Sequence, residues 1–126
     1  MTSIKENLQA IATRIYEGEK ATRSSLLTKL SSHYSAGRSD TEANYLQLVS
    51  FEAQMDCLAL SPDYFTCAEF ENTTHSVLRD FINKSIIQNI DSCMHNTAKL
   101  GEGKIAMAKL NGLVKLRAEL VEIVRL

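Results

Sequence analysis

Residues that interrupt regular structure are scarce in this chain. Its 126 residues include one proline and five glycines. Tight turns between short strands usually need these residues, so their scarcity argues against a sheet protein with many turns. The hydrophobic fraction of 44% and the charged fraction of 23% are those of a folded protein rather than a disordered one. A chain of this length can bury its own core, and we expect a single domain over residues 1–126.

Long hydrophobic runs are missing as well. No segment approaches the ~20 consecutive apolar residues that a membrane-spanning helix needs. The N-terminal sequence becomes polar at once and contains no apolar stretch of the kind found in secretory signals. The sequence therefore predicts a cytoplasmic protein without a membrane partner.

Apolar residues instead recur at helical spacing along most of the chain. Ser3 and Glu6 have the spacing of a capping box, and the stripe that follows predicts one helix over about 3–35, ended by Ala36-Gly37. Gly18 interrupts the stripe at a tolerable cost and could kink the helix. The stripe consists of Ile4, Leu8, Ile11, Ile15, Thr22, Leu26, Leu30 and Tyr34.

Further capping and breaking signals divide the rest of the chain. A second capping box at 39–42 begins a helix that closes at Ser61-Pro62, and the run 72–74 predicts a break, because its side chains compete for backbone hydrogen bonds. Strong patterns then cover about 75–99 and 104–126. The expected inner face of the second helix is Tyr45, Leu46, Val49, Ala53 and Leu58. Four long segments with short connections predict an all-α fold, an elongated four-helix bundle of up-down antiparallel helices or a bundle completed by dimerisation.

The last predicted helix is apolar on more than one side. Met107, Leu110 and Val114 fall on its expected inner face, whereas Leu116 and Ile123 fall outside it. A bundle helix needs only one buried face, so the excess favours a protein partner, with a homodimer as our expectation. The alternative is a few exposed Leu and Val side chains, which are normal on any surface. The candidate interaction residues here are Leu113, Leu116, Leu120, Ile123, Val124 and Leu126.

Charge is segregated along the chain, although the net charge is only −1. Residues 39–78 contain seven acids and no Lys or Arg, and both ends of the chain are basic. One interpretation is a docking face for a basic partner, with Glu42, Glu52 and Asp56 as candidate residues. The other is neutralisation of this segment by the basic helices beside it.

Signals for chemistry are sparse. Asp91 and His95 are spaced by one helical turn, but they would supply only two of the three or four ligands that a protein metal site needs. The three cysteines lie in no nucleophile motif, and Cys57 and Cys93 resemble small core residues, whereas Cys67 is the best candidate for exposure. We therefore expect no catalytic residues, no metal and no cofactor.

The leading functional hypothesis is a non-catalytic protein–protein interaction module, such as a small adaptor, chaperone or regulator. A nucleic-acid-binding regulator that uses the basic first and last helices is an alternative, although Glu119 and Glu122 dilute the basic field of the last helix. A metal-binding helical-bundle enzyme built around Asp91 and His95 is a further alternative.

Overall fold

Helices account for the regular structure of the described residues, which in the computed structural model are 3–31, 38–101 and 103–126. The all-α prediction is confirmed. In chain order the elements are α1 (Ile4–Ser31), α2 (Arg38–Leu58), the 3₁₀-helix η1 (Pro62–Thr66), α3 (Ala68–Asn72), α4 (His75–Phe81), the π-helical segment η2 (Ile82–Ile87), α5 (Gln88–Ala98) and α6 (Lys104–Val124). None of these helices is long and apolar enough to cross a bilayer.

The local start and stop signals act largely as the sequence predicts. The hydroxyl of Ser3 accepts a hydrogen bond from the backbone N–H of Glu6 at 3.1 Å, which caps α1. The expected break is also present, because α3 ends at Asn72 and Thr74 caps α4 by accepting from the N–H of Val77 at 3.3 Å. The capping box at 39–42 is displaced, since α2 already begins at Arg38.

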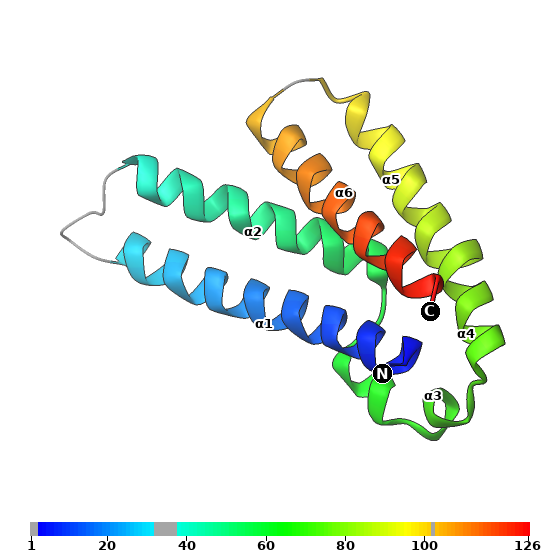
Figure 1. Cartoon of the computed structure of the whole chain (residues 1–126). Coiled ribbons are helices and arrows are strands. Elements are labelled where there is room, and N and C mark those ends of the chain that lie inside the picture. Colours follow the sequence, from blue (N-terminus) through cyan, green and yellow to red (C-terminus); the bar gives the residue numbers. More distant parts are fainter. Residues whose placement is uncertain (1–2, 32–37, 102) are drawn as a thin grey trace.

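Two antiparallel hairpins dominate the arrangement (Figure 1). The chain runs out along α1 and back along α2, and α5 and α6 form the second hairpin. The helices α2 and α6 run in the same direction and pack side by side, and an ion pair of 2.7 Å joins Lys104 to Glu42 near their N-terminal ends. The exact up-down four-helix arrangement is therefore not confirmed, because adjacent helices of that arrangement are antiparallel.

Two glycines allow the close packing of α2 between α1 and α6. A Cβ on Gly18 of α1 would lie 2.5 Å from the ring of Phe51, and a Cβ on Gly112 of α6 would lie 2.3 Å from the hydroxyl of Ser50. Both neighbours are consecutive residues of α2, so α2 is held from two sides at the same level. The kink considered at Gly18 does not interrupt α1, which is one continuous helix.

A single buried cluster joins all the elements, but it does not extend along the whole hairpin of α1 and α2. It contains residues from both hairpins and from the short helices between them. The predicted stripe of α1 is buried as far as Leu26, whereas Leu30 is 64% exposed. Tyr45, expected on the inner face of α2, is 44% exposed. Both expectations were wrong, because each side chain lies in the part of the α1–α2 hairpin that the buried cluster does not include. Tyr34 lies outside the described residues.

Candidate functional site

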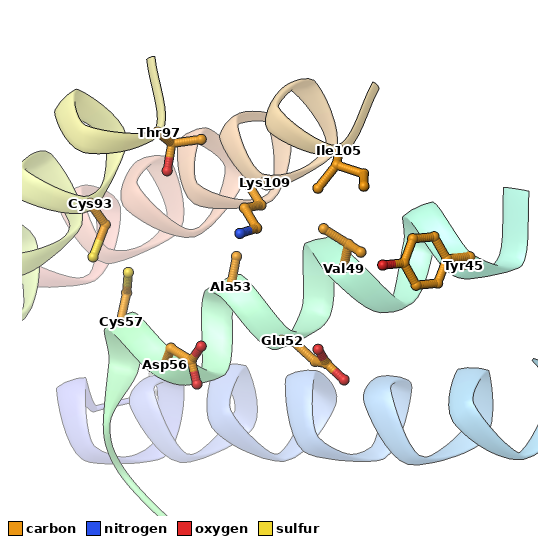
Figure 2. Close-up of a pocket in the computed structure, with 10 residues that line it drawn as sticks. All are labelled: Tyr45, Val49, Glu52, Ala53, Asp56, Cys57, Cys93, Thr97, Ile105 and Lys109. Atoms are coloured by element: carbon orange, nitrogen blue, oxygen red, sulfur yellow. The ribbon is translucent and has the colours of Figure 1, made fainter. Parts of the chain in front are cut away.

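The outward face of α2 forms one wall of a groove whose other wall comes from α5 and α6 (Figure 2). The groove has a volume of about 340 Å³, near the lower end of the size range of ligand pockets. Its lining residues are Tyr45, Val49, Glu52, Ala53, Asp56, Cys57, Cys93, Thr97, Ile105 and Lys109. Two of the three acidic residues that the sequence predicts for docking, Glu52 and Asp56, are therefore part of it.

Helical spacing explains why α2 presents these side chains together. Tyr45, Val49, Glu52 and Asp56 follow one another by four, three and four residues, which places them on one face. Phe51 faces α1 and Ser50 faces α6, so these neighbours contact α2 away from the groove. On the groove face, Glu52 and Asp56 are open to solvent.

Charge is unevenly distributed between the two walls. Glu52 and Asp56 project from α2, and the ammonium group of Lys109 reaches in from α6 (Figure 2). None of these three groups forms an ion pair with another described residue. Glu52 contributes, after Glu19, to raising the pKa of Arg23 on α1, so its field also reaches the neighbouring helix. The groove therefore combines an apolar floor with carboxylates that form no ion pair with a described residue.

Two cysteines lie at the inner end of the groove. Cys57 is 3% exposed and Cys93 is half-buried. Burial raises the pKa of the Cys57 thiol to about 12, and the Cys93 thiol and the Asp56 carboxylate add to this effect. Cys57 is therefore a protonated thiol at neutral pH, which is a poor nucleophile. The third cysteine, Cys67, donates its S–H to the carbonyl oxygen of Tyr64 at 2.9 Å, away from the groove.

The candidate residues of the last helix occupy two environments. Leu113, Leu116, Leu120 and Ile123 are buried in the core of the chain itself, Val124 packs against that core, and Leu126 is 56% exposed. The predicted register was wrong, because Leu116 and Ile123 belong to the buried face. The apolar side chains that face solvent on α6 are Ile105, Met107 and Val114. The helix turns the face centred on Leu116 inward because α1, α2, α5 and η2 surround it there.

Neutralisation of the acidic segment by direct ion pairs is limited. Glu42 pairs with Lys104, but the described acids Glu52, Asp56, Asp63, Glu69 and Glu71 form no ion pair with a described base. The side chain of Asp40 lies outside the described residues. Most of this negative charge is thus exposed to solvent.

The basic helices are more strongly paired. Both arginines of α1 are engaged, Arg14 with Glu119 at 2.6 Å and Arg23 with Glu19. The arginine of α6, Arg117, binds Asp91 at 2.7 Å, and this carboxylate raises the pKa of the guanidinium. These pairs reduce the charge that α1 and α6 could offer to phosphates.

Asp91, the carboxylate of the predicted i, i+4 pair with His95, is thus held by an arginine. His95 is exposed at the solvent side of α5. Across residues 3–31, 38–101 and 103–126, no three His, Cys, Asp or Glu side chains gather as metal ligands would. The geometry offers no support for a metal centre at this pair.

Sequence reasoning did not identify the groove residues of α5 and α6. Thr97, Ile105 and Lys109 carry no motif, and their place opposite α2 depends on how the two hairpins pack. The usable signal was on α2, where an acidic pair one turn apart, Glu52 and Asp56, lies beside small apolar residues. Comparison with family models, curated proteins and solved structures finds no match to the chain.

Proposed function

We propose that the chain is a non-catalytic protein-binding module whose groove between α2, α5 and α6 takes a short apolar segment of a partner protein that carries lysine or arginine. One observation carries the proposal: Glu52 and Asp56 border an apolar floor and form no ion pair with a described residue. A cation of the partner would supply the missing counter-charge, while its apolar side chains cover Val49 and Ala53. A cytoplasmic adaptor, chaperone or regulator fits this role.

The polarity of the groove also favours one orientation of the partner. Lys109 stands on the α6 wall, opposite the carboxylates of α2. A basic side chain of the bound segment would therefore lie toward α2, and an acidic group or a carbonyl oxygen would lie toward α6. Such complementarity steers association and fixes register more than it adds affinity.

A titration of ¹⁵N-labelled protein with two defined peptides tests the proposal. The first peptide is a short leucine–lysine peptide, and the second has glutamate in place of each lysine. We expect the lysine peptide to shift the amide resonances of Val49, Ala53 and Thr97, and the glutamate peptide to leave them unchanged. Added salt should weaken the interaction, because the charges at the groove are partly exposed.

Neutral variants separate the groove from the general charge of the chain. The double variant Glu52→Gln, Asp56→Asn should weaken the lysine peptide about five- to tenfold, the loss expected for two exposed ion pairs. A matched control, Asp63→Asn with Glu69→Gln, removes two acids of the same segment that do not line the groove. Equal weakening by both pairs of substitutions would show that only net charge matters and would refute the groove as the site.

A second copy of the chain is the other occupant to be tested. Sedimentation equilibrium over a wide concentration range measures the oligomeric state directly. A dimer that dissociates in the Glu52→Gln, Asp56→Asn variant would identify the partner as another copy. A strict monomer that still binds the lysine peptide would identify the partner as a different protein.

A further inference from the structure

The thiols of Cys57 and Cys93 face each other across the boundary between α2 and α5 (Figure 2). Both side chains line the inner end of the same groove, where the Cys93 thiol also lies 4.0 Å from the side-chain oxygen of Asn89. The two helices are tied at the same place, because the side-chain amide of Asn89 donates to the carbonyl oxygen of Cys57 at 3.0 Å. The residues are far apart in sequence, so their contact is made by the fold and not by a local motif.

We propose that Cys57 and Cys93 form a reversible intramolecular disulfide that links α2 to α5 when the protein meets a low-molecular-weight disulfide such as oxidised glutathione. The proposal does not depend on the protein-binding role of the groove. A disulfide requires a short Cβ separation and side chains directed toward each other, and the two thiols already have that orientation. Cys67 serves as the control thiol, because it lies outside the groove and donates a hydrogen bond to the carbonyl oxygen of Tyr64.

The difference in burial between the two thiols sets the order in which they react. Cys93 is half-buried at the groove and can meet the reagent, whereas Cys57 is nearly inaccessible. The Cys93 thiol loses its proton, and its sulfur attacks one sulfur of the reagent, so that the first glutathione leaves as a thiol. The Cys57 thiol then loses its proton to water and attacks the Cys93 sulfur, which releases the second glutathione thiol. Two protein thiols are oxidised and one glutathione disulfide is reduced to two thiols.

The second step is intramolecular, which compensates for the weak nucleophilicity of a buried thiol. The disulfide closes the loop made by residues 58–92, which contains η1, α3, α4 and η2. Closing a loop of this size restricts the unfolded chain, so the oxidised protein should resist unfolding better than the reduced protein. In a reducing compartment such a bond would be transient, as sensing disulfides are.

Thiol counting in glutathione redox buffers tests the proposal. The full-length protein is equilibrated at a series of oxidised-to-reduced ratios, alkylated with N-ethylmaleimide under denaturing conditions and weighed by mass spectrometry. The reduced protein should take three alkyl groups, and the oxidised protein should take one, with peptide mapping placing it on Cys67. The melting temperature should rise by about 5–15 °C on oxidation.

Single substitutions complete the test. Cys67→Ser should form the same disulfide, whereas Cys93→Ser should form no intramolecular bond and show no oxidation-dependent melting shift. Because Cys93 is half-buried, Cys93→Ser should still fold, and it therefore tests the proposal even if Cys57→Ser fails to fold. Three alkylations at every ratio, or a disulfide that involves Cys67, would overturn the proposal.

Discussion

The two ends of the long helix α1 lie in different surroundings. At the core end, residues 4–15 pack against α4 and α6, and each residue of the apolar stripe is buried. At the hairpin end, residues 22–31 lie beside α2, and Leu26 is the last residue of the stripe to be buried. Leu27 and Leu30 face solvent there. Figure 1 shows this end projecting to the left, away from α4 and α5.

Polar contacts also join α1 and α2 at the hairpin end. The ammonium group of Lys29 donates to the side-chain oxygen of Asn44 at 2.6 Å, and the amide of Asn44 lies 3.4 Å from the carbonyl oxygen of Thr22. Such contacts contribute little net stability when water competes for them. The apolar stripe keeps the same helical period at both ends of α1. The core end contributes to the core because helices besides α2 cover it.

The largest expected effect comes from the core end. Leu116 is fully buried on α6, and Leu116→Ala should lower the free energy of unfolding by about 2–5 kcal/mol through lost burial and a residual cavity. Urea unfolding followed by circular dichroism measures this change. The control Leu116→Met keeps the volume and should cost less than about 1.5 kcal/mol. A loss below that value for Leu116→Ala would mean that α6 does not pack on the core in solution.

The elements of this fold were largely predictable from the sequence, whereas their packing was not. The cap at Ser3 and the break before His75 depend on neighbouring residues in the chain, so a local reading finds them. The burial of Leu116 depends on four other elements that meet α6, and its own helix gives no sign of which apolar face they cover. When apolar residues surround most of a helix, their spacing alone does not determine which face is buried, and the buried face of α6 differs from the predicted one.

Substitutions at the two glycines that contact α2 should show how rigid its packing against α1 and α6 is. In Gly112→Ala the new Cβ would lie 2.8 Å from the backbone carbonyl oxygen of Ser50, so a helix must shift. We expect a loss of about 1–3 kcal/mol, larger than the gain in helix propensity of about 1 kcal/mol. In Gly18→Ala the contact is the ring of Phe51, a side chain that can turn aside, and we expect a smaller loss.

Urea unfolding of both glycine variants gives the comparison, with the helical content of each native state checked by circular dichroism. Equal losses would indicate that the ring of Phe51 is as immobile as the backbone of Ser50. A larger loss for Gly18→Ala than for Gly112→Ala would contradict the packing of α2 described above.

The candidate site, like the fold, could be predicted only in part from the sequence. Glu52 and Asp56 could be predicted because the acidic segment is visible in the sequence, and their common face follows from helical spacing. The facing thiols could not be predicted, because Cys57 and Cys93 belong to different helices and their contact requires α5 to cross α2 at that level.

Alkaline pH should lower the free energy of unfolding, because the buried thiol of Cys57 ionises more easily in the unfolded chain. The folded state holds the pKa of this thiol at about 12, above its ordinary value of 9.0, so the folded protein keeps a proton that the unfolded chain releases. Stability is therefore complete below pH 9 and falls as the pH rises from 9 to 12. At pH 10 the loss should be about 1 kcal/mol. Urea midpoints between pH 8 and 10.5, under reducing conditions, measure it.

Because other groups also titrate at alkaline pH, the variant Cys57→Ala supplies the reference. It should begin with a lower stability at pH 8 and then lose less than the wild type as the pH rises. Parallel profiles of the two proteins would mean that the Cys57 thiol ionises as easily in the folded state as in the unfolded chain.

The smallest effect is expected at the hairpin end. Leu30 lies on the extension of the stripe that the core end buries, but most of its surface is exposed. Leu30→Ala should change the free energy of unfolding by less than about 0.5 kcal/mol, measured under the same urea conditions as Leu116→Ala. A loss near that of Leu116→Ala would reverse the comparison, because a leucine can be so costly only where something covers it. Under dilute conditions that cover would have to come from the hairpin itself, and a loss that grew with protein concentration would instead place a second copy of the chain over Leu30.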